Sequence, residues 1–72
     1  NSRLGLNFFN FINSYRVEEA KKALRDEEQK NESILSIAYQ VGFNSKSTFN
    51  AIFKKFTSVT PTQYRNMQNL KL

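Results

Sequence analysis

The sequence predicts an all-α fold, a small helical bundle in which a long helix precedes two short amphipathic helices and a short closing helix. Apolar residues recur at three- and four-residue spacing along most of the chain, which is the period of a buried helix face. The chain has only 2 glycines and 1 proline, so long stretches contain no helix breaker. Its 72 residues are enough for one small domain with one modest core.

Residues 7–25 are predicted to form the long helix. Asn7 is a suitable cap, because its side-chain oxygen can accept a hydrogen bond from a free amide of the first turn. At about 100° per residue the apolar side chains form two groups, rotated from each other by roughly a third of a turn or more. These groups are Phe8, Phe11, Ile12 and Tyr15, and Val17, Ala20, Ala23 and Leu24. The rotation predicts either a helix that packs on different bodies at its two ends or a helix wrapped within one core.

The next segment, residues 26–32, is polar and is predicted to be a helix end followed by a solvated loop. Its sequence, DEEQKNE, lacks the alternating carboxylates and the turn glycine of a calcium-binding loop. No metal site is therefore expected there.

Composition excludes several classes of chemistry. The chain has no cysteine and no histidine, so disulfides, zinc sites built on thiolates or imidazoles, and Cys/His catalysis are excluded. No phosphate-cradling glycine loop and no pair of carboxylates on opposing apolar elements is found, so we expect no catalytic residue, no metal, no cofactor and no enzyme activity. No apolar run approaches the roughly 18 residues that a membrane span requires.

Residues 33–56 read as two short amphipathic helices joined by a tight turn, which is the sequence form of a helix-turn-helix. Ser33 is predicted to cap the first helix. Three residues are predicted to build the turn. Ala38 is small enough for the two helices to meet, Gly42 suits the left-handed conformation that ends a helix, and Phe43 fills the space between them.

The second helix of this motif is predicted over residues 45–56, with Ser45 as its cap. The phenylalanines Phe49, Phe53 and Phe56 are expected in the core, because they recur at helical spacing with apolar partners. A short closing helix is predicted from about Pro61 toward Met67, capped by Thr60 and Gln63. Residues 33–72 would thus form a homeodomain-like three-helix unit.

The positive charge is concentrated in the same region. Residues 1–32 carry six basic and six acidic groups, so that half is balanced. Residues 33–72 carry no Asp or Glu, and their basic residues are Lys46, Lys54, Lys55, Arg65 and Lys71. A field of one sign attracts a polyanion. The asymmetry favours a nucleic-acid partner over a basic face kept only for solubility.

Taken together, these motifs resemble the DNA-binding domain of AraC-family bacterial transcription regulators. The similarity covers nearly the whole chain, and the combination of its motifs is more specific than any one of them. The residues that carry it are Gly5, Phe8, Tyr15-Arg16-Val17-Glu18-Glu19-Ala20-Lys21, Ile34, Ile37-Ala38, Val41-Gly42-Phe43, Ser47, Phe49, Phe53-Lys54-Lys55, Thr60-Pro61 and Tyr64-Arg65.

The resemblance implies a domain organisation. The family domain usually contains two helix-turn-helix units joined by a long helix, and residues 7–32 resemble that helix and its loop. Residues 33–72 resemble the downstream unit, whereas residues 1–6 resemble only a remnant of the upstream one. The resemblance also implies a cytoplasmic, DNA-associated protein, with RNA polymerase as a further partner of the full-length regulator.

By resemblance, Lys46, Ser47 and Asn50 face the bases, with Thr48 near a base or the backbone. Lys can donate to guanine, Asn can pair bidentately with adenine, and a Thr methyl can meet a thymine methyl. Ala51 departs from the family, which often has a longer polar residue there. The residues expected at phosphates are Ser45, Lys54, Lys55, Thr60 and Arg65. The alternatives are ordinary solvated surface for the two lysines and a structural role for Arg65.

A helical protein–protein interaction module without DNA readout is the alternative function. If the upstream unit is missing, Phe8, Phe9 and Phe11 are expected to be bare, and an exposed aromatic patch invites self-association. RNA binding is not favoured, because the aromatic side chains read as buried, whereas single-strand binders display them beside basic residues.

Overall fold

The computed structural model describes the backbone of residues 2–69 and the side chains of residues 8–68. Within this range the chain forms four α-helices and no strand, which confirms the all-α prediction. The elements are α1 (Ser2–Arg25), the short 3₁₀ helix η1 (Glu27–Gln29), α2 (Ile34–Gln40), α3 (Lys46–Thr57) and α4 (Pro61–Asn69).

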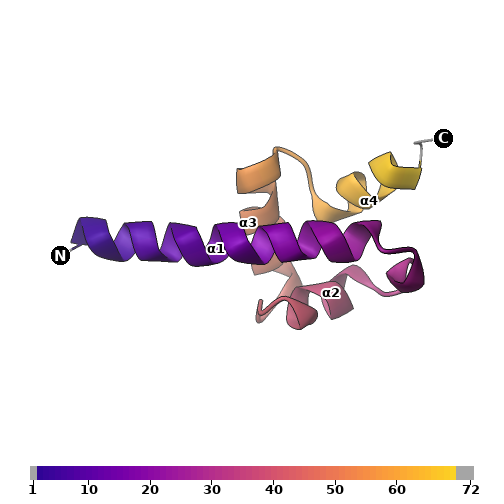
Figure 1. Ribbon diagram of the computed structural model, residues 1–72, viewed down its shortest axis with the longest axis horizontal. Helices are drawn as coiled ribbons and strands as arrows, with labels where there is room; N and C mark the ends of the chain where they lie inside the picture. Colours follow the sequence, from indigo (N-terminus) through magenta and orange to yellow (C-terminus); the bar gives the residue numbers. More distant parts are fainter. Residues whose placement is uncertain (1, 70–72) are drawn as a thin grey trace.

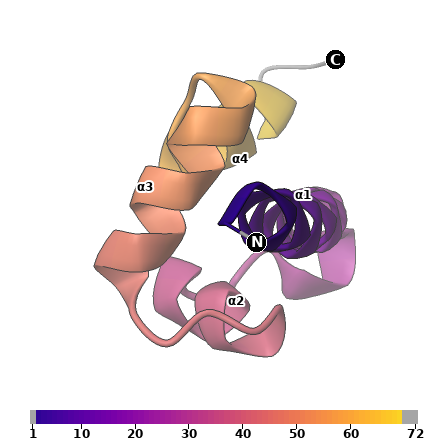
Figure 2. The same ribbon diagram turned by 90° about the vertical axis from the view of Figure 1, so that its left-hand side faces the viewer.

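Helix α1 is the spine of the molecule, and all the other elements pack against it. α2 and α4 lie on opposite sides of its C-terminal half, and α3 crosses it near the middle (Figure 1). Seen along α1, the other helices surround only part of its circumference (Figure 2). The N-terminal half of α1 extends past the rest, which gives the molecule its elongated shape of 46 × 21 × 17 Å.

The long helix begins earlier than predicted. It starts at Ser2, so Asn7 lies inside the helix and does not cap it. Nothing in residues 2–6 stops a helix, because Gly5 costs only about 1 kcal/mol relative to alanine and the segment contains no proline.

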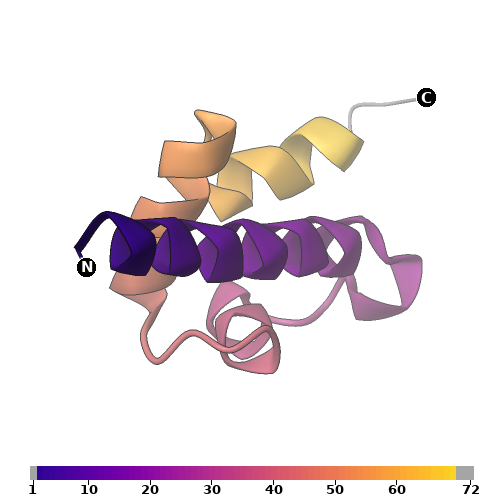
Figure 3. The ribbon, with the colours of Figure 1, turned by 60° about the vertical axis from the view of Figure 1, so that its left-hand side comes forward.

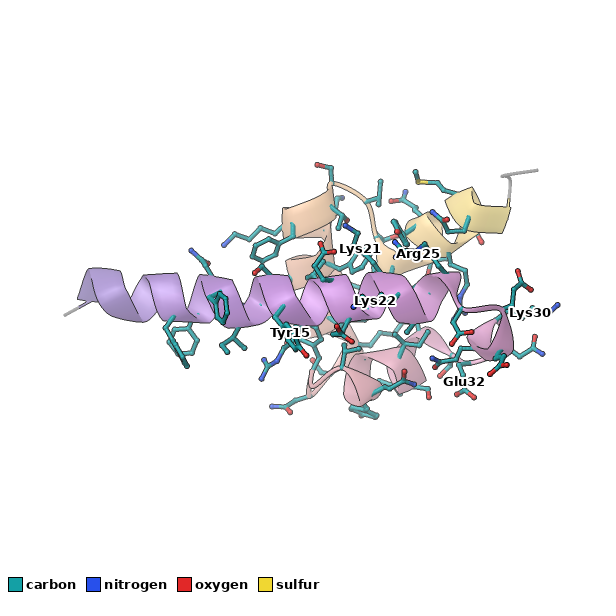
Figure 4. The ribbon with its side chains drawn as sticks, viewed as in Figure 1. Tyr15, Lys21, Lys22, Arg25, Lys30 and Glu32 are labelled. Carbon is teal, nitrogen blue, oxygen red and sulfur yellow. The ribbon has the colours of Figure 1, made fainter. Side chains whose placement is uncertain are left out.

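The two apolar faces of α1 have different surroundings. Its second group, from Val17 to Leu24, lies in the core. In the first group Phe8, Phe11 and Tyr15 are 61%, 67% and 61% exposed. Figure 4 shows Tyr15 on the side of α1 away from α4. The prediction of a helix wrapped within one core is therefore wrong for the described residues, and the aromatic face of α1 is bare.

The core is a single cluster in which aromatic rings run from the turn through α3 to α4. The ring centroids of Phe43 and Phe49 are 5.2 Å apart, those of Phe49 and Phe53 5.7 Å, and those of Phe53 and Tyr64 5.6 Å. The last two pairs meet edge to face, a favourable geometry. The other buried residues are Val17, Ala20, Ala23, Leu24, Ile37, Ala38 and Pro61.

The prediction that Phe56 belongs to the core is wrong, because its side chain is 39% exposed. α3 crosses α1 at a steep angle (Figure 1), so its last turn extends past the helix that covers Phe49 and Phe53. Helical spacing correctly predicted which face of α3 is buried. It did not predict how much of the length of α3 is packed against α1.

Local hydrogen bonds explain where the short helices begin. The Ser33 hydroxyl oxygen accepts from the amide of Ser36 at 3.0 Å, as its capping role predicts. Thr60 and Gln63 form a reciprocal capping box, with bonds of 2.9 and 3.1 Å. Residues 26–32, predicted as a helix end followed by a loop, contain η1, whose start is capped by the Asp26 carboxylate accepting from the amide of Glu28. None of the helices in the described residues combines the length and the hydropathy that a membrane span requires.

Candidate nucleic-acid interface

The turn between α2 and α3 is built by the three residues that the sequence singled out. Ala38 is fully buried, and its carbonyl accepts from the amide of Phe43 at 2.9 Å. Gly42 has a φ of 107°, which residues with a side chain rarely adopt. Phe43 is buried and packs on Phe49 in the first turn of α3. The turn is thereby fixed to the start of α3.

Arg16 of α1 covers this turn, a contact that the sequence analysis missed. Its guanidinium carbon lies 5.7 Å from the centre of the Phe43 ring, within range of a cation–π interaction. A Cβ atom at Gly42 would lie only 3.1 Å from the Arg16 Nε. Arg16 belongs to the segment Tyr15–Lys21 that carries part of the family resemblance, but nothing in the sequence pairs it with Gly42. The contact ties α1 to the turn that leads into α3.

The outer face of α3 is polar and faces solvent. Lys46, Ser47 and Thr48 in the first turn are exposed, and Asn50 is half-buried at the edge of this face. Ala51 is exposed between them and the lysines that follow. Three of the four residues predicted to read bases are therefore accessible in the first turn of α3, and the fourth, Asn50, is half-buried one turn after Lys46.

Ser45 and Thr48 are linked at the start of α3. The Ser45 hydroxyl oxygen accepts from the Thr48 amide at 3.2 Å and donates to the Thr48 hydroxyl at 3.0 Å. The Ser45 side chain thus has its hydroxyl hydrogen engaged within the protein. Its main-chain amide donates to no backbone carbonyl of the described residues.

The ion pairs of the described residues leave the lysines of α3 unneutralised. Lys21 pairs with Glu18 at 3.0 Å and Lys22 with Glu19 at 3.2 Å, and the more distant third pair, between η1 and Lys30, also lies before α2. Lys46, Lys54 and Lys55 are exposed and make no ion pair among the described residues, whereas Lys71 lies outside them. The excess positive charge of the second half of the sequence therefore includes three lysines of α3 that no carboxylate of the described residues neutralises.

The remaining two predicted phosphate residues are on α4. Arg65 directs its guanidinium to the loop before α2, where it donates to the carbonyl of Glu32 at 2.7 Å. Thr60 caps α4, and its hydroxyl hydrogen stays free because the oxygen is the acceptor in that bond. The contacts of Arg65 support the structural role that the sequence analysis considered beside the phosphate role.

No metal centre competes with this interpretation in the described residues, which contain no group of three or more potential ligand side chains placed to share an ion. The site offers hydrogen-bond donors, a positive field and small exposed side chains on a helix. That combination can recognise the edges of bases and the phosphates beside them.

Comparison with known proteins agrees with the geometry. A family model described as a helix-turn-helix domain matches residues 1–67. The chain is 45% identical over 62 residues to uncharacterized HTH-type transcriptional regulators of Staphylococcus aureus strains COL and MSSA476, covering 86% of this chain. It is 41% identical over 56 residues, or 78% of this chain, to an uncharacterized HTH-type transcriptional regulator in the cgkA 5′ region of Pseudoalteromonas carrageenovora.

These relatives are much longer than the matched region. The chain spans 8% of the length of the two staphylococcal proteins and 31% of the Pseudoalteromonas protein. No solved structure matches the chain.

Proposed function

Because the chain belongs to the AraC-type helix-turn-helix family of DNA-binding domains found in transcription regulators, we propose that it reads double-stranded DNA by inserting α3 into a major groove. One observation carries this mechanism. The exposed face of α3 gathers polar side chains and three unpaired lysines, and no carboxylate lies in residues 33–68 of the described structure.

Base reading is assigned to the first half of α3. Lys46, Ser47 and Thr48 occupy the first turn, the part of a recognition helix that reaches base edges. Asn50 lies one turn after Lys46, at the edge of the same face. Its side-chain amide can make two hydrogen bonds to an adenine. Ala51 leaves room for the helix to approach closely and offers a methyl group to thymine.

Phosphate contacts are assigned to groups that surround this face. Lys54 and Lys55 supply unpaired charge, and the free hydroxyl hydrogen of Thr60 and the amide of Ser45 supply neutral donors. Arg65 acts mainly as a structural tie between α4 and the loop before α2.

The wider setting is inferred from the family. Residues 33–72 form the reading unit, α1 and the loop after it support that unit, and the protein works in the cytoplasm on DNA. RNA polymerase is a partner of the whole regulator, and the chain itself has no enzymatic role. The bare Phe8, Phe9 and Phe11 promote self-association of this chain at high concentration.

In-vitro selection of duplexes from a random library tests the proposal. We expect enrichment of a short motif that fits one major-groove contact, with binding that weakens as salt rises. Binding without any enriched motif would contradict sequence readout by α3. If the chain bound a protein partner in a salt-insensitive way and bound no duplex, the protein–protein alternative would replace it.

A further inference from the structure

A hollow of about 500 Å³, open to solvent, lies between the C-terminal end of α3 and α4. Figure 3 shows α4 running beside that end of α3, on the same side of α1. The residues that line the hollow are Lys54, Ser58, Val59, Gln63, Asn66 and Met67. Of these, the reading of the sequence assigned a DNA role only to Lys54.

The lining has donors and no acid. Lys54, Ser58 and Asn66 are exposed, and no carboxylate lines the hollow. Gln63 uses its side-chain oxygen to accept from the Thr60 amide at 2.9 Å, which leaves the NH₂ group of its amide as a donor. The apolar part of the lining comes from Val59 and Met67. Ammonium, hydroxyl and amide donors beside an apolar surface suit an anionic ligand that also has an apolar part.

The hollow continues the outer face of α3, because Lys54 belongs to both. Lys46 and Lys54 are eight residues apart, which is about 12 Å along a helix at 1.5 Å per residue. B-DNA's major groove is about 12 Å wide and 8.5 Å deep. If the first turn of α3 reaches the bases, Lys54 therefore lies close to the sugar–phosphate strand at the edge of the groove. The hollow beyond Lys54 lies beside the same strand.

We propose that this hollow is the track of one sugar–phosphate strand, with phosphates at Lys54, Ser58 and Asn66 and deoxyribose rings against Val59 and Met67. The proposal rests on the proposed function, since it requires α3 in the groove. An acidic protein segment could meet the same ammonium group and the same apolar surface. DNA is favoured because the hollow is continuous with the reading face and lies in a half of the chain that contains no acid.

The test compares two substitutions that change the net charge equally. Asn66→Asp places a carboxylate in the hollow, and Asn31→Asp places one in the exposed loop after η1. The neighbours of Asn31, Lys30 and Glu32, lie at the end of α1 far from α3 (Figure 4). Each variant is titrated with a selected duplex and with a scrambled one, and circular dichroism checks that both keep their helices.

We expect Asn66→Asp to weaken binding to both duplexes by about tenfold, because a carboxylate next to a phosphate is repelled at short range. Asn31→Asp should weaken binding several-fold less. Equal losses for the two variants would overturn the track while leaving DNA binding by α3 intact. Duplex binding unchanged by Asn66→Asp, with weaker binding of a polyglutamate peptide, would overturn it in favour of a protein partner. A chain that binds no duplex at all would overturn the proposed function as well.

A second measurement locates the strand directly. The chain has no cysteine, so Asn66→Cys introduces a single thiol to which an iron–EDTA group can be attached. We expect cleavage of the backbone at one edge of the selected site, and no localised cleavage from the same group at Asn31→Cys. Cleavage that is absent or unlocalised from position 66, while the protein is bound, would contradict the track.

Discussion

Arg65 of α4 donates a hydrogen bond of 2.7 Å from Nη1 to the main-chain carbonyl of Glu32, the residue before the cap of α2. Its Nη2 reaches the carbonyl of Gln29 at 3.5 Å, and its Nε is buried without a partner among the described residues. A single guanidinium thus joins the closing helix to the loop that leads into the helix-turn-helix. α4 is therefore held to the start of α2 through this side chain as well as through the core.

Arg65→Ala should therefore lower the free energy of unfolding by about 1.5–3 kcal/mol, since hydrogen bonds from a charged group are lost. Urea denaturation measures the loss. Lys55→Ala removes the same charge from an exposed site and should stay within about 0.5 kcal/mol of the parent. If Arg65→Ala instead kept full stability and flattened the salt dependence of DNA binding, Arg65 would be a phosphate contact.

Lys46→Ala should weaken binding to the selected duplex by about 1–3 kcal/mol and should change binding to a scrambled duplex much less. The reason is that a base contact contributes only where the correct base is present. Fluorescence anisotropy with both duplexes measures the difference, and Lys30→Ala, at the distant exposed turn after η1, is the matched control. Unchanged affinity for the selected duplex would remove Lys46 from the base-reading set.

Lys54→Ala should weaken binding to selected and scrambled duplexes alike. Each phosphate contact releases condensed counterions, so the slope of log K against log salt should become less steep by about 0.9. Titration at several salt concentrations measures this slope. A loss confined to the selected duplex would show that Lys54 reads a base instead.

Gly42→Ala should destabilise the fold by about 1–2 kcal/mol, because a side chain is strained at positive φ. The new Cβ would also press on Arg16, 3.1 Å away. Adding Arg16→Ala should remove the destabilisation caused by the clash with Arg16. The destabilisation caused by the positive φ should remain. Thermal unfolding of the two single variants and the double variant measures the coupling. Strictly additive losses would show that Arg16 moves aside freely.

Phe11→Ser should suppress self-association, because Phe11 is the most exposed of the aromatic residues on the bare face of α1. Sedimentation velocity across a concentration series compares this variant with the parent chain. Phe56→Ser, on the exposed end of α3, is the control and should leave the association unchanged. A parent chain that stays monomeric at millimolar concentration would contradict association through this face.

The parts of the fold that the sequence predicted correctly depend on neighbouring residues. Ser33, Ser45 and the Thr60–Gln63 box all make the capping bonds expected of them, because each such bond spans three residues. The positive φ of Gly42 follows from the same kind of local chemistry. The face of α3 that is buried was also predictable, since helical spacing determines which side chains share a side.

The parts that were missed depend on residues far apart in sequence. Phe56 is exposed because α1 packs against only part of α3. The hydrogen bond from Arg65 to Glu32 joins residues that are 33 positions apart. The bond from Arg25 to the Tyr64 hydroxyl, at 2.7 Å, spans 39 positions. Spacing within one helix carries no information on such pairs. The hollow beside Lys54 was missed for the same reason, because two helices together create it.

The run of rings from Phe43 through Phe49 and Phe53 to Tyr64 has a mechanical consequence. It braces α3 along most of its length, and the bond from Arg25 to Tyr64 anchors the far end to α1. Tilting or sliding α3 on its own would therefore cost core contacts with α4 and the turn. If α3 enters a major groove as proposed, a duplex whose groove has the wrong width would have to widen or bend to fit it. We therefore expect the stiffness of flanking base steps, which no side chain touches, to influence which sites are occupied.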